Sequence, residues 1–260
     1  MGKIISIAIP KGGVGKTTTA VNLSLAMAKK GYEVLLVDVD PSGQCAASFK
    51  LNNYKNGSIF DVFSSTKKIE DVIYDSGYDN LSCIPMRKSS YNDEVRLLIL
   101  AEKVMNLRYA LSTLLVKFDF IIIDCPPSLT GTTTNILNAS NSVLIPIRAT
   151  KYSMDELGRI LNHVKLINKT SNANLKIEGI VLTIDEPKTK ISHKIKKELI
   201  LKYPNLIFKT SIPKTIKVQE ASFDNQPVLV YDPQSSCAKA YLKLADELIL
   251  RNELRGIFFE

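Results

Sequence analysis

The amino-acid sequence predicts an α/β fold in which a doubly wound, mostly parallel β-sheet is flanked by helices on both faces. Short apolar runs rich in β-branched residues alternate with longer segments of helical period, which is the pattern of consecutive βα units. Crossovers between parallel strands are almost always right-handed, so such units wind into one sheet. No linker or repeat interrupts the alternation, and we expect residues 1–260 to form a single domain. The apolar runs are residues 4–9, 34–37, 118–123, 142–147 and 177–183.

The segments between these runs differ in how clearly the sequence defines them. Residues 17–29 have helical period. Residues 52–87 form the least regular stretch, because Asn and Gly punctuate weak patterns there, and we interpret it as a peripheral segment. A long amphipathic helix is expected after Asn92, and another over residues 238–250, where an apolar stripe would dock on the sheet.

Composition indicates a globular protein and argues against several classes. The chain is 45% hydrophobic and 23% charged, and no stretch approaches the roughly 18 apolar residues that a membrane span needs. A strand pattern begins by Ile4, which leaves no room for a signal peptide, so we expect a cytoplasmic protein. The four cysteines are widely spaced and the two histidines lie far from other ligand types, so the spacing predicts neither disulfides nor a zinc site.

Positive charge is concentrated in one span of the chain. The net charge is +8, and residues 188–217 contain nine lysines but one acidic residue, Glu198. Such an excess attracts a polyanion, with nucleic acid and anionic membranes as the usual candidates. A solvated lysine-rich face would have the same composition, so charge alone leaves both interpretations open.

A glycine-rich loop joins the first predicted strand to the first predicted helix. Its glycines let successive N–H groups converge on a phosphate, and the N-terminus of the following helix adds a positive dipole. Lys16 is expected to reach the β- and γ-phosphates, and the Thr17 hydroxyl to hold Mg²⁺. The loop therefore predicts a site for a nucleoside triphosphate. It consists of Lys11, Gly12, Gly13, Val14, Gly15, Lys16, Thr17 and Thr18.

The loop departs from the strict P-loop pattern at its entrance. Pro10 stands five residues before Gly15, where the pattern has glycine, and a second lysine, Lys11, follows it. Lys16 already serves the phosphates of its own subunit. We therefore predict that Lys11 contacts the phosphate of a facing subunit.

Three aspartates follow the second and third apolar runs. Asp38 and Asp40 come after residues 34–37, and Asp124 comes after residues 118–123. In an open α/β sheet, ligands bind at the carboxyl ends of the strands, so these carboxylates should gather beside the loop. We expect Asp124 to hold Mg²⁺ or its water and Asp38 to support the metal side. Asp40 is placed to orient the attacking water, which indicates ATP hydrolysis.

Five segments together resemble the deviant Walker A ATPases of the ParA/MinD family, a branch of the P-loop NTPases. The resemblance covers nearly the whole chain, and within the family the sequence is most similar to the short ParA/Soj-type chromosome or plasmid partitioning ATPases. The segments are KGGVGKTTTAVNLS from Lys11, LLVDVDPSG from Leu35, FIIIDCPPSL from Phe120, SIPKTIKVQEAS from Ser211 and PVLVYDPQSSCAKAY from Pro227.

The resemblance implies a protein whose dimerisation and DNA binding depend on the bound nucleotide. It implies an ATP-bound homodimer in which Lys11 reaches the partner's nucleotide, with Mg²⁺ as the metal and Pro213 on the adenine side. It also implies nonspecific binding of double-stranded DNA, a ParB-type partner that stimulates hydrolysis, and a nucleoid-associated location. The DNA-contacting positions of the family fall on Lys188, Lys214 and Lys217, inside the lysine-rich span.

Two residue pairs depart from the family pattern, and other protein classes share parts of these motifs. The pairs Ile9-Pro10 and Thr150-Lys151 differ from the usual residues and concern the dimer and partner surfaces. The main alternative is a MinD-like membrane-associated positioning ATPase, although the tail at residues 256–260 ends in an acid and has no basic face. A metal-delivery ATPase would need cluster-binding cysteines, of which only Cys125 is suggestive, and a scaffold with negligible turnover is a further alternative. Because a strand follows Met1 so closely, no N-terminal helix-turn-helix domain is expected.

Overall fold

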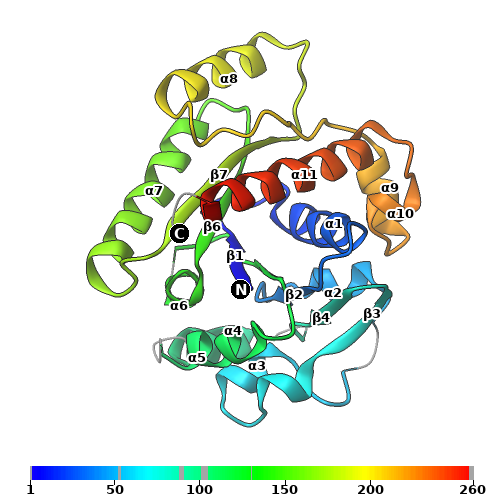
Figure 1. Cartoon of the computed structure of the whole chain (residues 1–260), viewed down its shortest axis with the longest axis vertical. Helices are drawn as coiled ribbons and strands as arrows, with labels where there is room; N and C mark the ends of the chain where they lie inside the picture. Colours follow the sequence, from blue (N-terminus) through cyan, green and yellow to red (C-terminus); the bar gives the residue numbers. More distant parts are fainter. Residues whose placement is uncertain (1, 52–53, 88–90, 101–104, 130, 258–260) are drawn as a thin grey trace.

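A seven-stranded sheet forms the centre of the protein, in the order β3-β4-β2-β5-β1-β6-β7 (Figure 1). The computed structural model describes residues 2–51, 54–87, 91–100, 105–129 and 131–257. Every neighbouring pair of strands is parallel except β3 and β4, which are antiparallel. The predicted doubly wound, mostly parallel sheet is confirmed. The strands are β1 (Lys3–Ile7), β2 (Val34–Asp38), β3 (Tyr74–Tyr78), β4 (Leu81–Ile84), β5 (Phe120–Asp124), β6 (Ser142–Arg148) and β7 (Lys176–Thr183).

Helices cover both faces of this sheet, because successive strand residues point to opposite faces (Figure 1). Ile4 packs into one core and Ile5 into the other. The core that contains Ile4 includes helices α3 (Ile59–Phe63), α4 (Tyr91–Leu100), α5 (Met105–Leu114), α6 (Gly131–Ala139), α7 (Ser153–Thr170) and α8 (Lys190–Lys202). The core that contains Ile5 includes helices α1 (Lys16–Ala28), α2 (Gln44–Ser48), α9 (Lys217–Phe223), α10 (Val228–Tyr231) and α11 (Ser236–Ile257).

The segment that the sequence leaves irregular contains short elements at one edge of the sheet. It includes α3, a 3-10 turn at Ile69–Val72, β3 and β4, each of four or five residues. β4 extends the sheet beside β2, and the pairing of β3 with β4 shifts register between Asp75 and Tyr78. Elements this short leave little periodicity for sequence analysis to detect.

The last two predicted helices are present with different bounds. The expected long helix after Asn92 corresponds to α4 and α5, and residues 101–104 between them lie outside the described part of the chain. The helix expected over residues 238–250 is the longer α11. No helix within the described residues combines the length and the apolar composition needed to cross a membrane. Residues 258–260 of the tail considered above also lie outside the described residues.

Candidate nucleotide site

The glycine-rich loop connects the end of β1 to the start of α1, as its sequence predicts. Gly13 and Gly15 have φ angles of +69° and +83°, in the left-handed region that favours glycine. A Cβ atom added at either position would meet nothing within 4 Å, so backbone conformation and not space requires glycine there. Gly15 is also the N-cap of α1 and contributes no side-chain cap, so the first N–H groups of the helix remain directed at the loop.

Lys16 lies inside this loop and is only 6% exposed. Its Nζ donates to the Lys11 carbonyl oxygen at 2.7 Å. Burial lowers the pKa of Lys16, and the nearby Asp124 and Asp40 carboxylates oppose that effect. The loop therefore holds a buried cation at its centre.

Asp124, at the end of β5, is fully buried and faces the first helical turn. Its Oδ2 accepts a hydrogen bond from the Thr17 hydroxyl at 2.6 Å. Its Oδ1 is buried and has no hydrogen-bond partner among the residues that the structure describes. Burial, and to a smaller extent the charge of Asp40, raises the pKa of Asp124 to about 7, against the opposing hydrogen bond from Thr17. A buried carboxylate with one unsatisfied oxygen beside a threonine hydroxyl fits a hard divalent cation such as Mg²⁺.

Asp38 and Asp40 leave β2 in different environments. Asp38 is fully buried, and its carboxylate accepts the backbone N–H groups of Asp40 at 3.0 Å and Cys45 at 2.9 Å. Burial and the Asp124 charge raise the pKa of Asp38 well above its ordinary value. Asp40 is half-buried in the turn that follows, where its Oδ1 accepts the Ser42 N–H at 3.0 Å.

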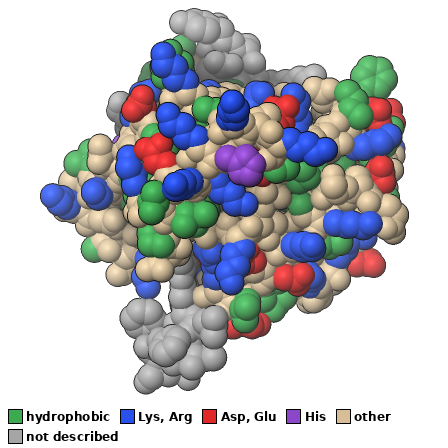
Figure 2. All heavy atoms as spheres, turned by 90° about the horizontal axis from the view of Figure 1, so that it is seen from above, with side chains coloured by type: hydrophobic (Ala, Val, Ile, Leu, Met, Phe, Trp, Pro, Cys, Tyr) green, Lys and Arg blue, Asp and Glu red, His purple; other side chains and the backbone are tan. Residues whose placement is uncertain are grey.

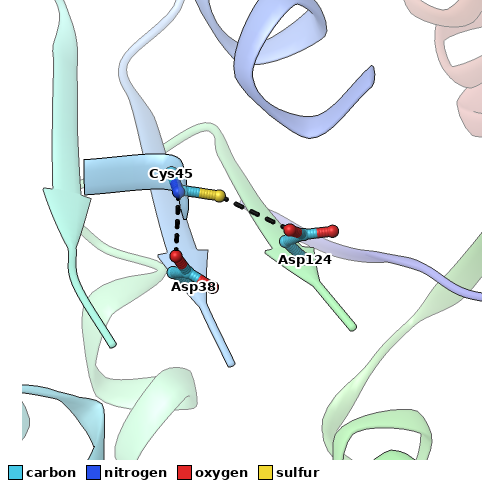
Figure 3. Close-up of side chains that lie close together, drawn as sticks. All are labelled: Asp38, Cys45 and Asp124. Carbon is cyan, nitrogen blue, oxygen red and sulfur yellow. Dashed lines mark hydrogen bonds between the residues drawn. The ribbon is translucent and has the colours of Figure 1, made fainter. Parts of the chain in front are cut away.

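The buried Cys45 joins the two deep carboxylates and was not predicted as a site residue. Cys45 is the second residue of the short helix α2, whose N-cap is the left-handed Gly43. Its Sγ lies 3.5 Å from Asp124 Oδ2, while its N–H bonds Asp38, as Figure 3 shows. One ligand atom from each of the three residues lies within 4.8 Å of the others. Its position is set by the turn after β2, which the cysteine spacing alone does not reveal.

Lys11 is directed away from the phosphate loop and toward α7. Its Nζ lies 2.7 Å from Glu156 Oε1 and 3.3 Å from Thr150 Oγ1. The side chains of Lys11 and Glu156 are 30% and 14% exposed. Thr150 departs from the family pattern, and Glu156 was not predicted as a site residue. Of the two lysine side chains, only that of Lys16 therefore lies within the glycine loop.

Pro213 borders a pocket of about 300 Å³ beside the glycine loop. Gly13, Gly15 and Thr18 line it on the loop side, and Pro213 lines it on the opposite side. The Thr183 hydroxyl, at the end of β7, donates to the Val14 carbonyl at 2.7 Å and fixes the two sides together. This volume is at the lower end of the range for small-molecule pockets, which suits a nucleoside next to the phosphate loop.

The three predicted DNA-binding lysines lie at the α8 and α9 end of the chain. Lys188 is exposed. Lys214 Nζ is 3.0 Å from Glu186, and Lys217 Nζ is 2.8 Å from Glu220. These two acids flank the lysine-rich span and were missed because the charge count ended at the lysines. Figure 2 shows the molecule from the side that is uppermost in Figure 1, where α8 lies, and on this face Lys and Arg side chains outnumber the acidic ones.

Comparison with known proteins decides the family. Residues 2–177 match a family described as an AAA domain. The chain is 37% identical over 249 residues to the sporulation initiation inhibitor protein Soj of Bacillus subtilis, covering 95% of this chain and 98% of the relative. It is 33% identical to the chromosome partitioning protein ParA of Myxococcus xanthus, with coverage of 97% and 89%. The chain belongs to the ParA/Soj family of partitioning ATPases.

Solved structures agree with this membership of the ParA/Soj family. The cell division ATPase MinD of Pyrococcus furiosus superposes with a TM-score of 0.79 at 26% identity, covering 95% of this chain and 98% of MinD. A plasmid partition protein of Borrelia burgdorferi bound to AMPPNP gives 0.79 at 26% identity, with coverage of 97% and 100%. Cobyrinic acid a,c-diamide synthase of Mycobacterium smegmatis, with bound ATP analogue and magnesium, gives 0.80 at 28% identity, with coverage of 98% and 97%. The P-loop ATPase fold and the family resemblance are both confirmed.

Proposed function

We propose that this partitioning ATPase is a DNA-segregation switch. Two copies close around two ATP molecules, the dimer binds double-stranded DNA without sequence preference, and a ParB-type protein stimulates hydrolysis to ADP and phosphate. The observation that carries the proposal is that the side chains of the two loop lysines point in different directions. The Lys16 side chain fills the loop of its own subunit, whereas the Lys11 side chain points away from the loop, 2.7 Å from Glu156, and would leave Glu156 to reach a second copy.

The loop and its carboxylates support ATP and Mg²⁺ as the ligands. Residues 11–18 supply the backbone N–H groups and the Lys16 charge for the phosphates, and Pro213 closes the nucleoside side of the pocket. Thr17, Asp38 and Asp124 are the residues that would hold Mg²⁺, which would neutralise phosphate charge. The partition protein and the diamide synthase described above were solved with an ATP analogue, and the latter also with magnesium.

Asp40 is the residue we assign to water activation. It is half-buried at the mouth of the site, where a water molecule can reach it, whereas Asp38 and Asp124 are completely buried. A carboxylate in this position can accept a hydrogen bond from water and orient it toward the γ-phosphate.

The lysine-rich span supports binding to DNA through its phosphates. Lys188, Lys214 and Lys217 present point charges, which neutralise phosphates without reading base sequence. The proposal places the ATP-bound dimer on the nucleoid and predicts steep salt dependence of its affinity.

The decisive experiment is DNA binding with ATP, ADP and no nucleotide. Wild type should bind DNA only with ATP, whereas Lys16→Ala should lose binding because it loses nucleotide. Lys11→Ala should retain nucleotide but lose ATP-dependent dimerisation and DNA binding. Lys67→Ala removes an exposed lysine outside the site and the basic span, and should behave as wild type. Equal DNA binding with ATP, with ADP and without nucleotide would refute the proposed switch.

The same assay separates the MinD-like alternative, which the structural likeness to MinD keeps in view. Cosedimentation with anionic lipid vesicles in ATP, without DNA binding, would favour a membrane-associated positioning ATPase. DNA binding without vesicle binding would favour the segregation switch.

A further inference from the structure

A thiol lies between the two buried carboxylates of the candidate metal site. Asp38 ends β2, Asp124 ends β5 and Cys45 is the second residue of α2. Figure 3 shows the Cys45 sulfur directed at Asp124 and the Asp38 carboxylate next to the Cys45 N–H. Each is 0% exposed. Neither the switch proposed above nor ATP hydrolysis requires a sulfur atom at this point.

We propose that Asp38, Cys45 and Asp124 form a binding site for a thiophilic divalent cation such as Zn²⁺ or Cd²⁺. A thiolate is a poor ligand for Mg²⁺, which prefers oxygen, but a strong one for softer cations. Two carboxylates and one thiolate give three protein ligands, and water or the Thr17 hydroxyl can supply the fourth.

The distances agree with this coordination. A tetrahedral zinc ion bonded to sulfur at about 2.3 Å and to oxygen at about 2.1 Å holds those two atoms about 3.6 Å apart. Cys45 Sγ and Asp124 Oδ2 are already 3.5 Å apart. The three ligand atoms lie within 4.8 Å of one another, so adjustments of about 1 Å complete the site.

Asp124 also carries uncompensated negative charge, on the oxygen that Figure 3 shows turned away from Cys45. Asp124 Oδ1 is buried and has no hydrogen-bond partner among the described residues. A buried anionic oxygen without a partner is costly, and a bound cation removes that cost. A pocket of about 190 Å³ lies next to the cluster, because its lining includes Thr17, which donates to Asp124, and Gln44, the residue before Cys45, while the three ligands themselves are buried.

Binding a thiophilic cation exchanges a proton for a metal bond. A cysteine thiol that no metal or neighbouring cation activates carries its proton at neutral pH. On binding, the S–H bond breaks, its proton leaves to solvent, and the sulfur electron pair forms the metal–sulfur bond. If the switch proposed above holds, this ion occupies the carboxylates assigned to Mg²⁺ and stops hydrolysis.

The test is titration of the full, nucleotide-free chain with Cd²⁺, followed by the ultraviolet absorption of the cadmium–thiolate bond. Wild type should show a saturable transition at one equivalent. Cys45→Ser keeps the size and a hydrogen-bond donor but should abolish the cadmium–thiolate absorption at one equivalent, since it removes the sulfur ligand of the site. Cys237→Ser, which removes a buried thiol on α11, should titrate as wild type. An unchanged transition in Cys45→Ser would overturn the proposal.

A measurement on wild type covers the case in which Cys45→Ser does not fold. X-ray absorption of the chain with one equivalent of Zn²⁺ should show one sulfur neighbour and oxygen neighbours otherwise. A shell without sulfur, or with several sulfurs, would refute the site. Neither measurement uses ATP, so absence of Mg²⁺-dependent hydrolysis would refute the proposed function without affecting this result.

Discussion

The ion pair between Lys11 and Glu156 gives the sharpest prediction for the switch. If Lys11 contacts the nucleotide of the partner subunit, it must leave Glu156, and the pair therefore opposes dimerisation. Replacing Glu156 with Gln removes the negative charge and keeps the shape of the side chain. We expect Glu156→Gln to strengthen ATP-dependent dimerisation.

The magnitude follows from the geometry of the pair. The Nζ to Oε1 distance is 2.7 Å, and Glu156 is only 14% exposed. Hydrogen bonds to charged groups contribute about 1.5–3 kcal/mol, and exposed pairs about 0–1 kcal/mol, so this half-buried pair should contribute about 1–2 kcal/mol. Dimerisation breaks this ion pair in both subunits, so the pairs together oppose dimerisation by about 2–4 kcal/mol, or roughly 30- to 900-fold in the dissociation constant of the dimer. Gln still accepts a hydrogen bond from Lys11, so we expect the lower end, about 30-fold.

The assay is the monomer–dimer equilibrium by sedimentation velocity, with AMPPNP to prevent turnover. The matched control is Asp155→Asn, because Asp155 carries the same charge one residue away but is exposed. The control should leave the dimer dissociation constant near that of wild type. A constant that is unchanged or larger in Glu156→Gln would refute the reasoning. Equal strengthening in both variants would show that net charge, and not the Lys11 contact, is responsible.

Three further predictions concern the carboxylates and the basic span. Asp40→Ala should retain ATP-dependent dimerisation and DNA binding but lose phosphate release, because only the water would be disoriented; loss of dimerisation would contradict this role. The pKa of Asp124 rises from 3.8 to about 7 on folding, so its ionisation makes the metal-free fold less stable as pH rises from about 4 to 7. Asp124→Asn should therefore be more stable than wild type at pH 8 in chelator, by up to about 4 kcal/mol, and urea unfolding that shows the reverse would contradict it. Glu186→Gln removes the ion-pair partner of Lys214 and should tighten DNA binding. Lys214→Ala should weaken DNA binding and reduce the magnitude of the slope of log affinity against log salt by about one per lost phosphate contact. Equal DNA affinities of wild type and both variants would exclude Lys214 from the DNA interface.

Local patterns explain which parts of the site the sequence predicts. The glycine loop is a continuous motif whose conformation depends on its own residues, so Gly13, Gly15 and Lys16 could be placed without any tertiary structure. The strand-end aspartates follow from a general property of parallel sheets, which gathers Asp38 and Asp124 at one edge.

Contacts between distant segments could not be predicted in the same way. Glu156 meets Lys11 only because α7 packs against the sheet beside the loop, and no periodicity encodes that meeting. Cys45 reaches Asp124 through a turn and a five-residue helix, which are too short for a reliable pattern. Glu220 neutralises Lys217 from outside the counted span, so a linear charge count overstates the free positive charge.

The pocket beside the glycine loop and the basic span share one buried residue, Asp185, which bears on how the proposed nucleotide site could control DNA binding. Asp185 is 4% exposed and accepts hydrogen bonds from the Ser192 hydroxyl of α8 and, at 2.8 Å, from the Ser211 hydroxyl. Its backbone carbonyl accepts the Lys214 N–H at 2.9 Å, next to Pro213 in the pocket wall. A ligand that shifts this wall therefore acts on the same carboxylate that holds the first turn of the lysine-rich helix. Asp185 therefore connects the pocket wall to α8 by direct hydrogen bonds within one subunit.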